Sequence, residues 1–140
     1  MLPMIAIAQL PMHWTLEANL AAIEAAMRRA RAEGAAICAF AELALTGFHR
    51  EIVSQGVPGK VDPAIDRVRA LAGELGLAVA VGAPSFGDGG ARFNSHLLID
   101  EHGVLQARVH KIGLTAPEAT SSSPAAPGRW PRCRASVAAR

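Results

Sequence analysis

Three short apolar runs, separated by two stretches with helical periodicity, constrain the fold of this chain more than any other feature. The runs are residues 4–10 (MIAIAQL), 35–41 (AAICAFA) and 77–83 (LAVAVGA). Runs of this length with almost no polar residue are typical of strands buried on both faces. Buried strands that alternate with helices predict an α/β layered fold.

Two helices are predicted between these runs. The first covers about residues 16–33 and ends before Gly34, a natural C-terminal stop. The second begins with Asp62 as N-cap and Pro63 at the first helical position, and ends at Gly76. Each helix has one apolar face. These faces consist of Leu20, Ile23, Met27 and Ala30 in the first helix, and of Ile65, Val68, Ala72 and Leu75 in the second.

An antiparallel hairpin is predicted after the third run. Residues 92–99 (RFNSHLLI) and 104–110 (VLQARVH) flank a polar loop, 100–103 (DEHG), that ends in glycine. Residues 86–90 (FGDGG) are predicted to form the turn that precedes it. The hairpin adds two strands to the α/β layer.

The charge distribution divides the chain near residue 120. Residues 1–120 contain ten basic and all twelve acidic side chains, a net charge of −2, whereas the whole chain has +2. Residues 121–140 (SSSPAAPGRWPRCRASVAAR) contain no carboxylate and show no helix or strand periodicity. Such a composition predicts disorder. We therefore expect one domain, 1–120, and a disordered tail, 121–140.

The composition also argues against several classes of protein. There is no basic stripe with interleaved aromatic residues, so we do not expect nucleic-acid binding. No apolar run is long enough to span a membrane, and the N-terminal run lacks the features of a signal peptide, so a cytoplasmic location is expected. The two cysteines form no CxxC pair and the five histidines lack ligand spacing. We expect no metal and no cofactor.

Two charged residues directly follow predicted strands. Glu42 comes after the run 35–41, and Lys111 comes after the strand 104–110. Strand ends in layered α/β folds are where sites gather. The apolar run is expected to shield the Glu42 carboxylate partly from water. If the two strands lie side by side, they place a base and a cation in one cleft.

Four blocks of the sequence resemble, in the right order, the nitrilase or carbon–nitrogen hydrolase superfamily. Residues 4–10, with Trp14 and Asn19, resemble its opening strand and helix. The other three blocks are 34–48 (GAAICAFAELALTGF), where a strand ends at the catalytic Glu; 77–83 with Phe93, Asn94 and Ser95; and 110–118 (HKIGLTAPE), the catalytic Lys block. The resemblance covers about residues 4–119 and implies a four-layer α–β–β–α sandwich, of which this chain holds about half.

The resemblance implies the chemistry of a Cys–Glu–Lys triad acting on a small-molecule amide or nitrile. The Cys thiolate attacks the carbon, the Glu is the general base, and the Lys ammonium stabilises the tetrahedral intermediate. The matching positions are Glu42 for the base, Lys111 for the cation and Glu118 for a second, auxiliary Glu. Intact members of the family are expected to be homo-oligomers.

The nucleophilic Cys of the family has no clear counterpart here. Cys38 lies inside a predicted buried strand and is expected to be a small core residue. Cys133 lacks the preceding apolar strand and the acidic follower of the family motif, although its neighbouring arginines could make it a reactive thiol. We therefore expect the chain by itself to be inactive or severely impaired as an enzyme.

The abrupt change in composition after Thr120 leads to the hypothesis of a truncation or frameshift. A Ser-Ser-Ser-Pro run is what TTC-type Phe codons can give when they are read one base out of step, and the family has a Phe-rich stretch there. Two alternatives to an enzyme stay open: a non-catalytic half-domain that associates with an intact homologue, and a gene fragment without function. A half-sandwich exposes apolar sheet surface, so poor solubility or association is expected.

Overall fold

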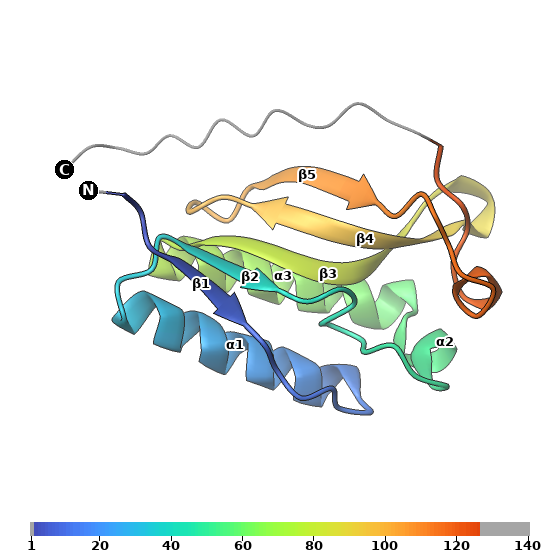
Figure 1. Cartoon of the computed structure of the whole chain (residues 1–140), viewed down its shortest axis with the longest axis horizontal. Helices are drawn as coiled ribbons and strands as arrows, with labels where there is room; N and C mark the ends of the chain where they lie inside the picture. Colours follow the sequence, from blue (N-terminus) through green and yellow to red (C-terminus); the bar gives the residue numbers. More distant parts are fainter. Residues whose placement is uncertain (1, 127–140) are drawn as a thin grey trace.

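The computed structural model describes residues 2–126, in which one five-stranded sheet carries helices α1 and α3 on one face (Figure 1). The strands are β1 (Ile5–Ala8), β2 (Ile37–Phe40), β3 (Ala78–Phe86), β4 (Arg92–Ile99) and β5 (Leu105–His110). The helices are α1 (Leu16–Ala32), the short α2 (Ile52–Gln55) and α3 (Pro58–Leu75), with 3₁₀ turns η1 (Asp88–Gly90) and η2 (Glu118–Thr120). The predicted α/β class is confirmed.

The strands lie in the sheet in the order of the chain, β1-β2-β3-β4-β5. The pairs β1–β2 and β2–β3 are parallel, whereas β3–β4 and β4–β5 are antiparallel. The predicted hairpin is therefore present as β4 and β5. With this topology, the carboxyl ends of β2, β3 and β5 lie at the same edge of the sheet as the beginning of β4.

The first helix forms as the sequence predicts, and the second begins earlier. At the start of α1 the Thr15 hydroxyl accepts a hydrogen bond from the Ala18 amide at 3.3 Å, and Gly34 follows the helix with a φ of 88°. The prediction that the second helix begins at Asp62 and Pro63 is wrong, because α3 begins at Pro58. Pro58 suits the first turn as well as Pro63 does, and Pro63 lies on the exposed side of α3.

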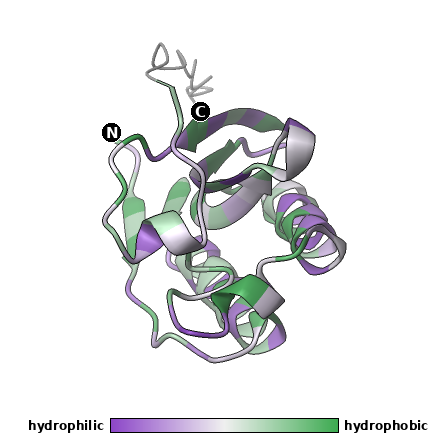
Figure 2. Cartoon of the chain, turned by 90° about the vertical axis from the view of Figure 1, so that its right-hand side faces the viewer, coloured by the Kyte–Doolittle hydropathy of each residue, from purple (hydrophilic) through white to green (hydrophobic). Residues whose placement is uncertain are grey.

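The hydrophobic core lies between the two long helices and the face of the sheet that they cover. The helices contribute Ile23, Met27, Val68 and Leu71, and the sheet contributes Cys38, Phe40, Val79, Val81, Leu97 and Ile99, all of which are buried. Hydrophobic and hydrophilic bands alternate along the helices (Figure 2), as expected for helices with one face on a core. Cys38 is a core residue as predicted, and burial raises the pKa of its thiol, which makes it a poor nucleophile.

The other face of the sheet is apolar and is not covered by α1 or α3. The alternation of side chains along the strands places on it Ile5, Ile7, Ile37, Ala39, Ala80 and Leu98. The prediction that residues 4–10 form a strand buried on both faces is wrong for β1, because Ile7 is 84% exposed and Ile5 57% exposed. The apolar run therefore belongs to a strand with one face on the core and one face uncovered.

None of the helices in residues 2–126 is long and apolar enough to cross a membrane. The last described residues, 121–126, follow η2 without forming a helix or strand. Ser123 lies beside the start of β4, where its amide donates to the Arg92 carbonyl at 2.5 Å and its hydroxyl accepts from the Arg92 amide at 3.2 Å. The rest of the predicted tail, with Cys133, lies outside the described residues, and a domain boundary at residue 120 stays a prediction.

Candidate active site

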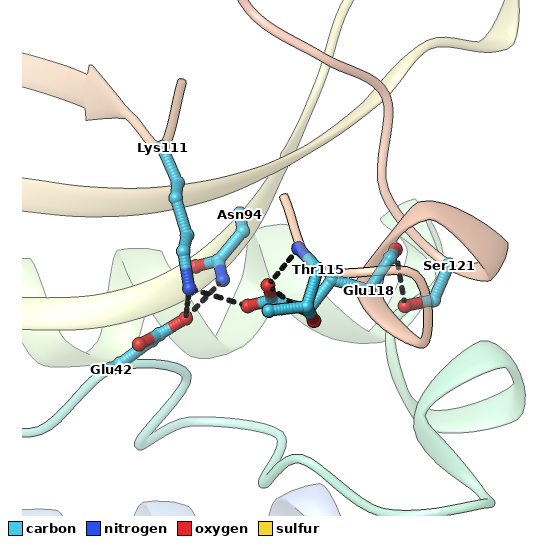
Figure 3. A network of polar contacts seen from close by, with 6 residues as sticks. All are labelled: Glu42, Asn94, Lys111, Thr115, Glu118 and Ser121. Atoms are coloured by element: carbon cyan, nitrogen blue, oxygen red, sulfur yellow. Dashed lines mark hydrogen bonds and ion pairs between the residues drawn. The ribbon is translucent and has the colours of Figure 1, made fainter. Parts of the chain in front are cut away.

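Three charged side chains meet at one edge of the sheet. The Lys111 ammonium donates to Glu42 Oε1 at 2.9 Å and to Glu118 Oε1 at 2.5 Å (Figure 3). Glu42 follows β2, Lys111 follows β5, and Glu118 begins η2. The structure therefore brings together all three residues that the sequence singled out as candidates for catalysis.

The two strands that carry Glu42 and Lys111 are not neighbours, contrary to the arrangement considered from the sequence. β3 and β4 lie between β2 and β5. The turn after β2 folds back against β3, where the Leu45 amide donates to the Gly82 carbonyl at 3.1 Å. Lys111 reaches the same place from the other side with its long side chain.

Gly82 allows this turn to lie against β3. A methyl group on Gly82 would overlap the Leu43 amide nitrogen and the Ala41 carbonyl oxygen. Leu43 itself has a φ of 49°, a left-handed conformation that is uncommon for residues other than glycine. Gly82 lies on one side of this contact and Leu43 on the other. Together they fix the backbone that carries Glu42.

Two uncharged residues donate to the carboxylates of the network, and the sequence analysis assigns neither of them a role. The Asn94 side-chain amide donates to Glu42 Oε1 at 2.5 Å (Figure 3). The Thr115 amide and hydroxyl donate to Glu118 Oε2 at 2.7 and 2.8 Å. Asn94 was part of the quoted family block, and Thr115 stands three residues before Glu118, a spacing that suits a local side-chain bond. These two features are the signals in the sequence that point to Asn94 and Thr115.

The electrostatics of the cluster favour the charged forms of Lys111 and Glu118. The Lys111 ammonium, together with the Thr115 donors, lowers the pKa of Glu118 to about 2, against the effect of burial. The bonds to Glu118 and Glu42 in turn raise the pKa of Lys111 above its ordinary value. The Glu118 side chain is only 7% exposed, whereas that of Glu42 is 53% exposed, so the predicted shielding of Glu42 is limited. Glu118 is the buried anchor of the cluster and Glu42 its accessible carboxylate.

The depressed pKa of Glu118 predicts a pH dependence of stability. A carboxyl whose pKa falls from 4.5 to about 2 on folding stabilises the protein above pH 4.5 and loses that contribution as the pH falls toward 2. We therefore expect Glu118→Gln to have a lower melting temperature than the unsubstituted chain at pH 7, with the difference shrinking between pH 4.5 and 2. Thermal melts followed by circular dichroism test this, and a difference that does not change with pH would contradict it.

The neighbouring histidines have structural partners. His110 Nδ1 lies 2.8 Å from Ser95 Oγ, and its ring stacks on Phe93 at 4.6 Å. The His49 ring packs against Trp14 at 4.8 Å. Within residues 2–126, no group of three or more His, Cys, Asp or Glu side chains is arranged to hold a metal ion.

A small pocket lies beside the Glu42 turn. It has a volume of about 110 Å³ and lies between that turn, the end of β1 and the start of α1. Its apolar lining includes Leu10, Met12, Phe40 and Phe48. Of the three charged residues of the cluster, only Glu42 lines this pocket.

Comparison with known families identifies the family to which the chain belongs. The family model described as carbon–nitrogen hydrolase matches residues 4–136. This chain belongs to the carbon–nitrogen hydrolase family. Its membership agrees with the resemblance seen in the four blocks of sequence. No curated protein sequence gives a match.

The solved structures similar to this hydrolase-family chain include an amidase from Nesterenkonia sp. AN1. One structure of that amidase has a TM-score of 0.80 and 30% identity, and the alignment covers 88% of this chain and 49% of the amidase. A mutant of it showing acrylamide added at the active-site cysteine has a TM-score of 0.79, 28% identity and coverage of 88% and 50%. The chain thus spans about half the length of these relatives.

Proposed function

We propose that this chain supplies the Glu–Lys part of the active site of an enzyme that hydrolyses small-molecule amides by a Cys–Glu–Lys mechanism. The observation that carries the proposal is the convergence of Glu42, Lys111 and Glu118, with distances of 2.9 and 2.5 Å from the Lys111 ammonium to the two carboxylates. Glu42 is the base, Lys111 the cation, and Glu118 holds Lys111 in place. Nitriles are the second substrate class of the family.

The geometry supports different roles for the carboxylates of Glu118 and Glu42. Glu118 is buried and strongly acidic, so it stays charged and serves as a fixed counter-ion. Glu42 is accessible, and it can take the proton of a thiol as the sulfur attacks the amide carbon. The Lys111 ammonium stabilises the oxyanion that forms. Glu42 then returns the proton to the leaving nitrogen, and the acyl-enzyme is hydrolysed by water that Glu42 activates.

The nucleophile must come from outside residues 2–126. The one cysteine among these residues, Cys38, is buried in the core with a raised pKa. In the related Nesterenkonia amidase, acrylamide is found at an active-site cysteine. We propose that the chain alone is inactive or severely impaired, and that a family-type second half would complete the triad.

The direct test is ammonia release from butyramide, the compound found in complex with a mutant of the Nesterenkonia amidase. We expect no release by this chain and measurable release by a fusion of residues 4–120 to the second half of that amidase. A folded fusion that releases no ammonia from any short amide would contradict the proposal.

The open apolar face of the sheet favours a second candidate function, a non-catalytic half-domain that packs against an intact homologue. Ile7 is 84% exposed on this face, on the edge strand β1, and full burial of an isoleucine contributes about 1.5–3 kcal/mol. We expect the chain to associate, and Ile7→Ser to weaken that association in light scattering after gel filtration. Val53→Ser is the matched control, because Val53 is 53% exposed on α2, away from the sheet. An unsubstituted chain that is monomeric at high concentration would contradict this function.

A further inference from the structure

The two oxygens of the Glu42 carboxylate have different surroundings. Oε1 accepts hydrogen bonds from Asn94 Nδ2 at 2.5 Å and from Lys111 Nζ at 2.9 Å. Oε2 accepts none from any of residues 2–126. The Glu42 side chain as a whole is 53% exposed. Within the described part of the chain, the carboxylate therefore has one oxygen that accepts two hydrogen bonds and one that accepts none.

Asn94 contacts both partners of the ion pair. Its side-chain amide donates to Glu42, and its main-chain carbonyl oxygen accepts a hydrogen bond from the Lys111 main-chain amide at 2.8 Å. The residue is only 4% exposed and belongs to β4, which pairs with β3 at Pro84. An amide buried in a strand has few alternative positions, so Asn94 restricts the positions of both Glu42 and Lys111.

Lys111 by itself is a weaker constraint on Glu42. Its ammonium is shared with Glu118, and it lies at the end of a flexible four-carbon stem. The three donors of an ammonium have no fixed plane, so its attraction for a carboxylate depends little on which of the two oxygens it meets. The short, directional bond from the buried Asn94 amide does select one, because the amide donors have a fixed geometry.

We propose that Asn94 is a positioning residue, whose amide holds Glu42 through Oε1 and leaves Oε2 as the oxygen that takes part in proton transfer. This inference rests on the proposed function. The proton passes from the thiol to Oε2 as the sulfur–carbon bond forms and the carbonyl electrons move to its oxygen. It then passes from Oε2 to the leaving nitrogen as the carbon–nitrogen bond breaks. Oε1 already accepts two hydrogen bonds, from Asn94 and Lys111.

The test uses Asn94→Leu, which keeps the shape of the side chain and removes its donors. We expect side-chain NMR couplings to show one rotamer of Glu42 in the unsubstituted chain and an average of several in Asn94→Leu. Ser95→Ala is the control, because Ser95 binds Ser85 and His110 and not Glu42. A single, unchanged Glu42 rotamer in a folded Asn94→Leu chain would overturn the proposal.

A second measurement avoids any change at Asn94. The side-chain amide proton bonded to the Glu42 carboxylate is expected to resonate downfield and to lose this shift in Glu42→Ala. It should keep the shift in Glu51→Gln, since Glu51 is an exposed carboxylate elsewhere in the chain. An amide signal that Glu42→Ala leaves unchanged would overturn the proposal. Neither measurement needs a nucleophile. A negative ammonia-release test, which contradicts the proposed function, is therefore distinguishable from an NMR result that contradicts the positioning role of Asn94.

Discussion

Gly82→Ala is expected to destabilise the chain by about 3 kcal/mol, because the added methyl group has no room and must displace the turn that carries Glu42. The overlap is with the backbone atoms of Leu43 and Ala41, which cannot rotate away as a side chain could. The turn is also held there by the bond from the Leu45 amide to the Gly82 carbonyl. Urea unfolding followed by circular dichroism measures the change.

Gly59→Ala is the matched control for this substitution. Gly59 lies in the first turn of α3, and a methyl group there meets no atom within 4 Å. Alanine is favoured over glycine in a helix by roughly 0.5–1 kcal/mol, so this variant should be as stable as the unsubstituted chain or slightly more stable. Equal stabilities of Gly82→Ala and Gly59→Ala would show that the turn does not lie on β3 as described.

Glu42→Gln is expected to have the largest effect on catalysis. In the fusion of residues 4–120 with a family-type second half, we expect ammonia release from butyramide to fall by roughly 10²–10⁴-fold, the usual contribution of a general base. Glutamine preserves the shape of the side chain and can still accept hydrogen bonds from Asn94 and Lys111. The loss would therefore report on proton transfer and not on the fold.

Glu51→Gln controls for the removal of a carboxylate as such. Glu51 is exposed, and its carboxylate contacts Arg50 and Ser54 among residues 2–126. Its substitution should leave ammonia release unchanged. If Glu42→Gln retained full activity in the fusion, Glu42 would not be the base, although the network around Lys111 could still exist.

Most of the fold could be predicted from the sequence because its signals are local. The spacing of Ile23 and Met27 identifies the inner face of α1, and Gly34 marks its end. The exposure of Ile7 could not be predicted, since an apolar run has the same pattern whether or not a second layer covers it. The start of α3 was misplaced because Pro58 and Pro63 are both acceptable in an early helical turn.

The charged residues of the candidate site could be predicted from the sequence, but the uncharged residues that support them could not. Glu42 and Lys111 were singled out by their places after strands and by the family resemblance. The role of Asn94 depends on the register of β4 against β3, which no local pattern reveals. Gly82 did carry a signal, since a lone glycine in a strand often marks a close backbone approach, but the sequence does not say which segment approaches.

The measurement that tests this account most directly is an NMR titration of the Lys111 side-chain ammonium. If Lys111 lies between Glu42 and Glu118, its pKa is raised above the ordinary 10.5, and it falls in both Glu42→Gln and Glu118→Gln. The charged lysine then stabilises the fold until the pH rises through this raised pKa. A Lys111 pKa at its ordinary value, unchanged by either substitution, would show that the base and the cation do not meet.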